Sequence, residues 1–132
     1  MSRLMLDTSG YSALVRGHAE IKTALESAEE ITVSPIVLGE LYAGFRKGSR
    51  RVENENKLSR FLSLQDVSIS AIDEDTAAAY AEIVNYLGDA GRPIPANDIW
   101  IAAGAMQHGL RLLTTDAHFK CVPQVIIEWY PV

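Results

Sequence analysis

Five short apolar segments, separated by longer stretches with helical periodicity, constrain the fold of this chain more than any other feature. The segments are residues 4–6, 31–33, 67–72, 112–115 and 125–127, and most are rich in β-branched side chains or bounded by polar ones, as buried strands are. Helices are predicted between them at 19–30, 35–46, 50–63, 73–91 and 97–109. Because a parallel crossover needs a connection of helix length, this alternation predicts an α/β fold, a three-layer α/β/α sandwich with a mostly parallel sheet.

The segment 73–91 carries the clearest helical signal. Its apolar face is predicted to consist of Ala77, Tyr80, Ala81, Val84 and Leu87. Asp73 or Asp75 is expected to cap its start, and Gly88 or Gly91 to end it. In two other helices, Pro35 suits a first turn and Gly109 suits a stop.

Length and composition predict a single domain over residues 1–132. A chain of this length buries roughly two thirds of the surface that it exposes when unfolded. No apolar run approaches the roughly 20 residues that span a bilayer, and the first residues lack a secretory leader, so we expect a soluble protein without a membrane segment. The single cysteine, Cys121, cannot form an internal disulfide, which favours a reducing cytoplasm.

The balance of charge disfavours long-range attraction to nucleic acid. Seventeen acidic residues against twelve basic ones give a formal net charge of −5. Half of the basic residues, however, lie between Arg46 and Arg60, interrupted only by Glu53 and Glu55. This run is either a local basic patch or an ordinary solvated helix face.

Three acidic residues occupy positions where ligands bind in open parallel sheets, outside the carboxyl ends of the strands. Asp7 follows the first predicted strand, Asp116 follows the strand at 112–115, and Asp98 lies at the start of a predicted helix. Each of them alone fits a helix cap or a turn. Asn97 is itself a possible cap, which would leave Asp98 free for another role.

Glu40 is the fourth acid, and its place in a helix is unusual. It lies one turn after Ile36 and one turn before Gly44, so it is predicted to share an apolar face with Val37 instead of facing solvent. No basic residue of that helix lies one turn away. A carboxylate buried there needs a partner, either a distant arginine or a cation.

Together the four acids predict a site for a hard divalent cation. Clustered carboxylates raise one another's pKa values unless a cation lies among them. Oxygen ligands without a nearby thiolate or imidazole suit Mg²⁺ or Mn²⁺ better than zinc. His18 and His108 are expected in solvent or at helix ends, and for His118 a surface loop is preferred over contact with a substrate.

Four motifs resemble those of PIN-domain ribonucleases, and most closely those of the VapC toxins of prokaryotic toxin–antitoxin pairs. They are LDTS at 6–9, PIVLGELYAGF at 35–45, NDIWIAA at 97–103 and LLTTDAHF at 112–119, which is followed by VIIEW. They occur in order and at the family's spacing over nearly the whole chain. One departure is His118, which stands where many relatives carry a further acid.

The resemblance implies a PIN-like fold and a metal-dependent endoribonuclease that acts as a toxin. It assigns binding of Mg²⁺ or Mn²⁺ and catalysis to Asp7, Glu40, Asp98 and Asp116. Hydroxyls of Thr8, Ser9 or Thr114 would hold ligands or water, and Asn97 would orient its neighbour. Metal-activated water would hydrolyse RNA and leave 5′-phosphate and 3′-hydroxyl ends.

The resemblance also implies an RNA substrate, a cognate antitoxin and a homodimer. An antitoxin would lay a tail over apolar helices and push a basic side chain into the acidic site, near Tyr42, Phe45, Phe61 and Leu62. At least half of these four side chains are expected in the core. The residues predicted to contact RNA, through its phosphates, are Arg46, Lys47, Arg50 and Arg51.

Three other classes of protein remain open at this point. A haloacid-dehalogenase-like phosphatase would need a second Asp two residues after Asp7, where Ser9 stands. A receiver domain would need adjacent acids after the first strand and a lysine at the end of a late strand, whereas Lys120 lies past the strand. A protein-binding domain without catalytic activity is the third alternative.

Overall fold

The computed structural model describes residues 2–132, and within them five strands form one sheet. The strand order is β3-β2-β1-β4-β5, and every neighbouring pair is parallel. The strands are β1 (Arg3–Leu6), β2 (Glu30–Val33), β3 (Val67–Ile69), β4 (Arg111–Thr114) and β5 (Ile127–Trp129). The predicted parallel sheet is therefore confirmed, with shifted ends: β3 stops at Ile69, and β5 begins two residues later than expected.

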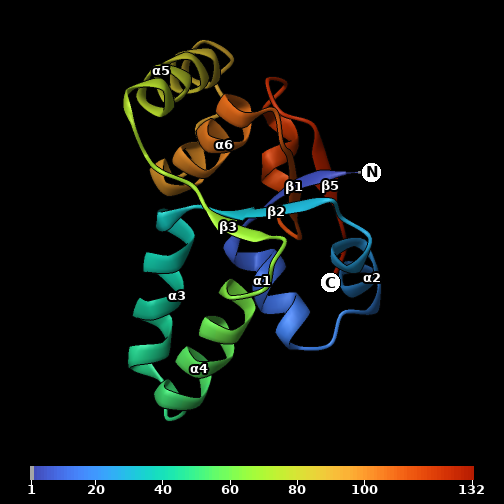
Figure 1. Ribbon diagram of the computed structural model, residues 1–132. Coiled ribbons are helices and arrows are strands. Elements are labelled where there is room, and N and C mark those ends of the chain that lie inside the picture. The colour runs from blue at the N-terminus through green and yellow to red at the C-terminus, as the bar shows by residue number, and fades with distance from the viewer. Residues whose placement is uncertain (1) are drawn as a thin grey trace.

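Helices cover both faces of the sheet, as Figure 1 shows: α5 and α6 lie on one side, and α1 to α4 lie on the other. The helices are α1 (Thr8–Val15), α2 (Ala19–Glu26), α3 (Pro35–Lys47), α4 (Arg51–Leu62), α5 (Glu74–Asp89), α6 (Ala96–His108) and a short 3₁₀ helix, η1 (Ala117–Cys121). The three-layer α/β/α sandwich is confirmed. Over residues 2–132, no helix combines the length and apolar character that crossing a bilayer requires.

The centre of the core lies between β1, β4 and α6. Leu4, Met5 and Leu6 of β1 are fully buried, and the middle of α6 consists of small residues. A Cβ atom on Gly104 would lie 3.1 Å from the end of the Met5 side chain, so α6 approaches β1 closely. This close packing holds the first turn of α6 near the carboxyl end of β1.

The sequence did not predict α1 or η1. The α1 segment, TSGYSALV, is short and rich in Ser and Gly, and its intrinsic helical propensity is low. Tertiary packing stabilises it instead, because Gly10, Tyr11 and Ala13 are buried. A Cβ on Gly10 would lie 2.8 Å from a methyl group of Leu6 and 3.1 Å from the carbonyl oxygen of Leu113, so this turn of α1 packs directly on β1 and β4.

The predicted apolar face of α5 is confirmed at Tyr80, Val84 and Leu87, which pack in or against the core, and was wrong at its other two positions. The buried residues are Thr76, Ala79, Ile83 and Leu87, whereas Ala77 and Ala81 are exposed. The difference arises because Thr76 faces α6 and its hydroxyl bonds Gln107, so a polar residue starts the buried stripe. Asp73 caps the helix in a reciprocal capping box with Thr76.

Helix ends elsewhere match the expected signals. Pro35 occupies the first turn of α3, and Gly109 ends α6 with a φ of 64°. Gly91, just beyond α5, has a φ of 68°, a left-handed conformation that glycine adopts readily.

Candidate metal centre

Asp7 directly follows β1 and is held by three neighbouring groups. Its carboxylate accepts hydrogen bonds from the Gly10 N–H at 2.7 Å, the Ser9 hydroxyl at 2.9 Å and the Thr114 hydroxyl at 2.7 Å. The residue is only 3% exposed. Burial raises the pKa of Asp7 in spite of these bonds, and the negative charge of Asp98 adds to the rise. Asp7 therefore caps α1 and belongs to a group of acids at the same time.

Asp98 lies in the first turn of α6, close to the other acids. Burial raises the pKa of this carboxyl, and the charges of Glu40 and Asp116 raise it further, while His118 opposes the change. Since Asp98 also acts on Asp7, the four carboxyl groups share one electrostatic neighbourhood at the carboxyl edge of the sheet. All four acids singled out in the sequence thus act on this edge of the sheet, and among the described residues Asp98 and Asp116 lie close enough to share one ion.

The cap of α6 is Pro95, and no side chain caps this helix. Asn97 is therefore not the cap, although the sequence allowed that role. The helix begins one residue earlier than expected, so Asn97 is already inside its first turn. Its side-chain amide donates instead to a carboxylate oxygen of Glu40, at 3.4 Å.

Glu40 lies on α3 at the rim of the site. The Thr8 hydroxyl donates to one of its oxygens at 2.5 Å, and Asn97 donates to the other. Its side chain is partly exposed, so the expectation of a buried apolar position was wrong. The reason is that α3 projects past the end of the sheet, where its inner face meets polar residues of α1 and α6. A hollow of about 350 Å³ beside Glu40 and Asn97 opens this rim to solvent.

His118 lies inside the acidic group, which the sequence analysis did not predict. Its Nε2 is 2.8 Å from Asp98 Oδ2, and its Nδ1 is 2.7 Å from Asp116 Oδ1. One ligand atom from each of these three residues lies within 4.8 Å of the others. The preferred interpretation of His118 as a surface loop residue was therefore wrong.

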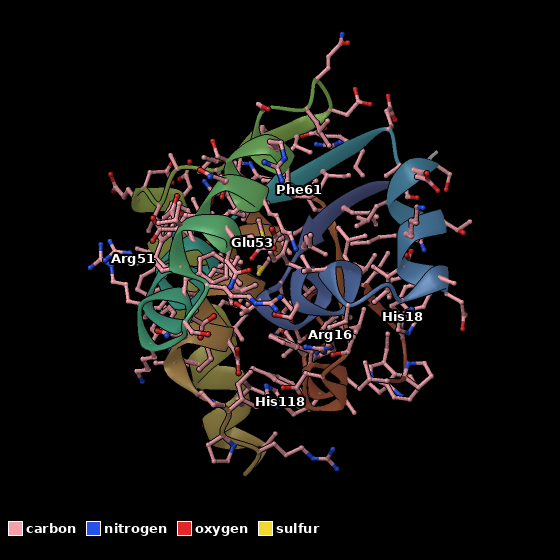
Figure 2. All side chains as sticks on the ribbon, turned by 90° about the horizontal axis from the view of Figure 1, so that it is seen from below. Arg16, His18, Arg51, Glu53, Phe61 and His118 are labelled. Carbon is pink, nitrogen blue, oxygen red and sulfur yellow. The ribbon has the colours of Figure 1, made fainter. Side chains whose placement is uncertain are left out.

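A local turn explains the position of His118. Asp116 caps η1 by accepting the backbone N–H of His118 at 3.1 Å, and this tight turn brings the imidazole back over the capping carboxylate. The signal in the sequence was the spacing of Asp and His, two residues apart after a strand. In Figure 2, His118 lies well apart from Arg51 and Phe61, which both belong to α4.

Thr114 and Ser9 connect the acidic residues of the two central strands. Besides bonding Asp7, the Thr114 hydroxyl accepts the backbone N–H of Asp116 at 2.9 Å. The Ser9 hydroxyl accepts the backbone N–H of Thr115 at 3.0 Å. The two hydroxyls thereby fix the distance between the end of β1 and the loop after β4.

The basic run at 46–60 spans the outer end of α3 and most of α4, and Figure 1 shows these helices extending away from the sheet. Three of its cations form ion pairs with acids of the same helix: Arg50 with Glu53 at 4.0 Å, Arg51 with Glu55 at 3.0 Å, and Lys57 with Glu53 at 3.7 Å. In the part of the chain that is described, Arg46 and Lys47 have no such pair. RNA binding by this run stays a prediction.

Most of the four side chains expected near an antitoxin groove, Tyr42, Phe45, Phe61 and Leu62, pack against the core. Phe45, Phe61 and Leu62 are half-buried against the core, and Tyr42 is 39% exposed, which confirms that at least half of the four belong to the core. A cavity of about 170 Å³ lies between α1, α3 and α4. Its lining combines apolar, polar and basic side chains: Tyr11, Ser12, Val15, Arg16, Leu41, Phe45, Asn54 and Lys57.

The profile of the PIN domain matches residues 4–124. The chain belongs to the PIN domain family. Ribonuclease VapC4 of Mycobacterium tuberculosis is 37% identical over 93 residues, which cover 70% of this chain and 72% of the relative. Ribonuclease VapC1 of Rickettsia felis is 35% identical, with 86% and 84% covered, and toxin FitB of Neisseria gonorrhoeae is 32% identical, with 96% and 99% covered.

Solved structures of VapBC complexes share this PIN fold. The structure of VapBC2 from Rickettsia felis, bound to a promoter DNA fragment, matches with a TM-score of 0.84 at 30% identity, covering 95% of this chain and 96% of the other. DNA-bound VapBC from Salmonella typhimurium matches with a TM-score of 0.85 at 26% identity, covering 97% and 98%. The chain is thus a VapC-type PIN domain.

Residues that bear on the phosphatase and receiver alternatives have other roles in this PIN domain. Ser9 donates to Asp7 and occupies the place of the second acid that a phosphatase would need. Lys120 lies over the ring of Trp129 and not among the four acids. The phosphatase alternative therefore lacks its second carboxylate, and the ammonium group that a receiver requires is held against Trp129.

Proposed function

We propose that this PIN domain is a Mg²⁺- or Mn²⁺-dependent endoribonuclease and acts as the toxin of a toxin–antitoxin pair in the cytoplasm. The observation that carries the proposal is the convergence of Asp7, Glu40, Asp98 and Asp116 at one edge of the sheet, where burial and mutual repulsion raise the pKa values of Asp7 and Asp98. Charges held this close are stabilised by a cation. The names of the relatives, ribonuclease VapC and toxin FitB, support the activity and the biological role.

The donor set fits a hard divalent cation. The four carboxylates, Asp7, Glu40, Asp98 and Asp116, would hold the ion, and oxygen ligands suit Mg²⁺ and Mn²⁺. His118 sits between two of these carboxylates, so its ring either joins the ligands or moves aside when an ion binds. When bound, the ion would polarise the phosphodiester, activate water and offset the net charge of −5 close to the substrate.

The surrounding residues would orient the carboxylates. Thr114 and Ser9 fix both oxygens of Asp7, and Thr8 with Asn97 fixes both oxygens of Glu40. Such outer hydrogen bonds typically contribute about 10- to 100-fold to metal affinity or activity. Because most of these bonds are made by hydroxyls, they can hold a carboxylate without adding competing charge.

An antitoxin is the proposed protein partner, since the matching structures from Rickettsia felis and Salmonella typhimurium are VapBC complexes. Its tail would use the cavity between α1, α3 and α4, whose lining of apolar, polar and basic side chains suits an amphipathic segment. A basic side chain of the antitoxin would then reach the acidic centre. A homodimer is the proposed form in which two such centres line a longer RNA groove.

Contacts with RNA phosphates are proposed for Arg46, Lys47, Arg50 and Arg51. Each phosphate contact releases counterions from the RNA, and this release makes binding dependent on salt. Replacing both Arg50 and Arg51 with Ala should therefore weaken RNA binding and flatten its dependence on salt. Binding measured by fluorescence anisotropy at several salt concentrations would check this. An unchanged slope would show that the two arginines only form their pairs with Glu53 and Glu55.

The nuclease proposal is tested by incubating the purified chain, freed of co-purifying protein, with total cellular RNA and Mg²⁺ or Mn²⁺. Cleavage ends are mapped for the wild type, for the wild type with EDTA, and for Asp98→Asn. The control variant is Asp75→Asn, which changes an exposed acid in the first turn of α5. Discrete cuts carrying 5′-phosphates are expected for the wild type and the control alone. Intact RNA with a folded, metal-binding wild type would contradict the proposal.

A further inference from the structure

Trp129 lies beside the acidic centre and is tethered to it. It ends β5, and the parallel register pairs it with Thr114, whose hydroxyl holds Asp7. Its indole N–H donates to the carbonyl oxygen of Thr115, at 3.1 Å, directly before Asp116 in the chain. The side chain remains 37% exposed. An aromatic ring is thus fixed in orientation at the edge of the site and open to solvent.

Lys120 places a positive charge against this ring. Its ammonium nitrogen lies 3.7 Å from the ring centroid, a cation–π contact. Lys120 is exposed and belongs to η1, the short helix that Asp116 caps. Within residues 2–132 no carboxylate lies within 4 Å of its ammonium group, in contrast to Arg51 and Lys57 of α4. Its charge is therefore not neutralised by a neighbour.

The other tryptophan of the chain shows what a purely structural indole looks like here. Trp100 of α6 stacks on Tyr80 of α5, with centroids 4.1 Å apart and ring planes at 22°. A half-buried aromatic side chain of the neighbouring helix thus covers one face of Trp100. The neighbour of Trp129 is instead a flexible, exposed lysine, which can move and leave the ring available for stacking.

We propose that Trp129 and Lys120 form a nucleotide subsite next to the metal centre. The indole stacks on a base of single-stranded RNA beside the phosphodiester to be cleaved, and the Lys120 ammonium contacts a phosphate of the same strand. This inference rests on the proposed nuclease function. Exposed aromatic rings paired with cations are the groups by which proteins bind unpaired nucleotides, and stacking of this kind is tolerant of sequence.

The subsite also gives the acidic protein a local means of binding RNA. The run at 46–60 has half of the basic residues, but three of its cations are paired with Glu53 or Glu55. Lys120 lies four residues after Asp116 and carries an uncompensated charge. The segment that carries Asp116 thus also carries a cation combined with an aromatic platform.

The test measures binding of a fluorescently labelled ten-nucleotide oligouridylate in Mg²⁺, with all variants made in an Asp98→Asn background that prevents cleavage. Trp129→Ala should weaken binding by about tenfold, as expected for loss of one stacked base, and Trp129→Phe should weaken it less. Lys120→Gln should reduce the salt dependence by about one phosphate contact, and Lys120→Arg should retain it. Lys22→Gln, an exposed lysine of α2, is the matched control and should leave both quantities unchanged.

Fluorescence adds a readout that distinguishes stacking from a structural role. In a Trp100→Phe protein the only indole is Trp129, and its emission should be quenched when the oligonucleotide binds. Unchanged affinity of Trp129→Ala together with no quenching would overturn the subsite. If cleavage of cellular RNA by the Trp129→Ala protein with Asp98 intact still requires a divalent cation, the nuclease proposal stands even though the subsite fails. Absence of cleavage by the wild type would count against the nuclease proposal itself.

Discussion

Asp7 and Asp73 both cap α-helices in this PIN domain, yet their surroundings give them opposite properties. Asp73 caps α5 in solvent, where the Thr76 backbone N–H and the Gln107 amide bond its carboxylate and lower its pKa. Asp7 caps α1 and accepts three hydrogen bonds, but burial raises its pKa and the charge of Asp98 adds to the rise.

The comparison shows that hydrogen bonding alone does not identify a functional acid. Both caps satisfy backbone N–H groups, which is the ordinary role of Asp at a helix start. What distinguishes Asp7 is burial at the carboxyl edge of the sheet, near other carboxylates. The fold keeps an unfavourable charge there, and a cation would compensate for it.

The largest expected difference between the two caps concerns activity. Asp7→Asn should lower the rate of RNA cleavage by more than about 100-fold, because loss of a proposed metal ligand should exceed the 10- to 100-fold effect of an outer hydrogen bond. Asp73→Asn should leave the rate unchanged, since Asp73 lies at the start of α5 and bonds only groups of α5 and α6. Initial rates at saturating Mn²⁺ provide the measurement. Equal rates for the two variants would contradict the proposal that Asp7 is a metal ligand.

The hydroxyls that support each cap offer a second, smaller contrast. Thr114→Val removes the 2.7 Å bond to Asp7 while conserving shape, so it should reduce Mn²⁺ affinity by about 10- to 100-fold. Thr76→Val removes the corresponding hydroxyl at Asp73 and should affect thermal stability but not Mn²⁺ affinity. Isothermal titration calorimetry would compare them. A Thr114→Val protein with wild-type affinity would show that Asp7 needs no such support.

The smallest expected effect is on the Tm of the protein without metal. Replacing Asp7 should change this Tm in the opposite direction from replacing Asp73. The raised pKa of Asp7 means that its charge opposes folding at neutral pH, and this penalty is lost as the pH falls through the raised pKa towards the ordinary value of 3.8. The lowered pKa of Asp73 means that its charge favours folding above that value, and the benefit is lost as the pH falls through the lowered pKa. In EDTA at neutral pH, Asp7→Asn should raise the Tm and Asp73→Asn should lower it.

Thermal unfolding followed by circular dichroism, from about pH 8 down to about pH 4, would check these signs. The gain of Asp7→Asn should shrink towards the acidic end of the range. A Tm that falls in Asp7→Asn at every pH would mean that its three hydrogen bonds outweigh its burial.

Much of the architecture could be predicted from the sequence because strand and helix periods differ clearly. Segments such as 4–6 and 112–115 are apolar and short, and each is followed by an acid, so the sheet and the place of Asp7 and Asp116 could be inferred together. The stop at Gly109 and the start at Pro35 depend on local backbone preferences and were equally accessible.

The remaining features depend on tertiary contacts that periodicity does not encode. Helix α1 exists because Gly10 packs on β1 and β4, not because its residues favour a helix. Glu40 is partly exposed because α3 passes the end of the sheet, and His118 reaches Asp98 because η1 turns back over Asp116. The sequence predicted the helix of Glu40 but neither α1 nor η1, and the mutual geometry of these residues follows from how the elements pack.

The central claim, that Asp7, Glu40, Asp98 and Asp116 form a cation site, is tested most directly by electron paramagnetic resonance of Mn²⁺ titrated into the wild type, Asp7→Asn and Asp73→Asn. The account predicts that free Mn²⁺ is depleted equally by the wild type and Asp73→Asn, and much less by Asp7→Asn. Equal depletion by all three proteins, or none by the wild type, would contradict it.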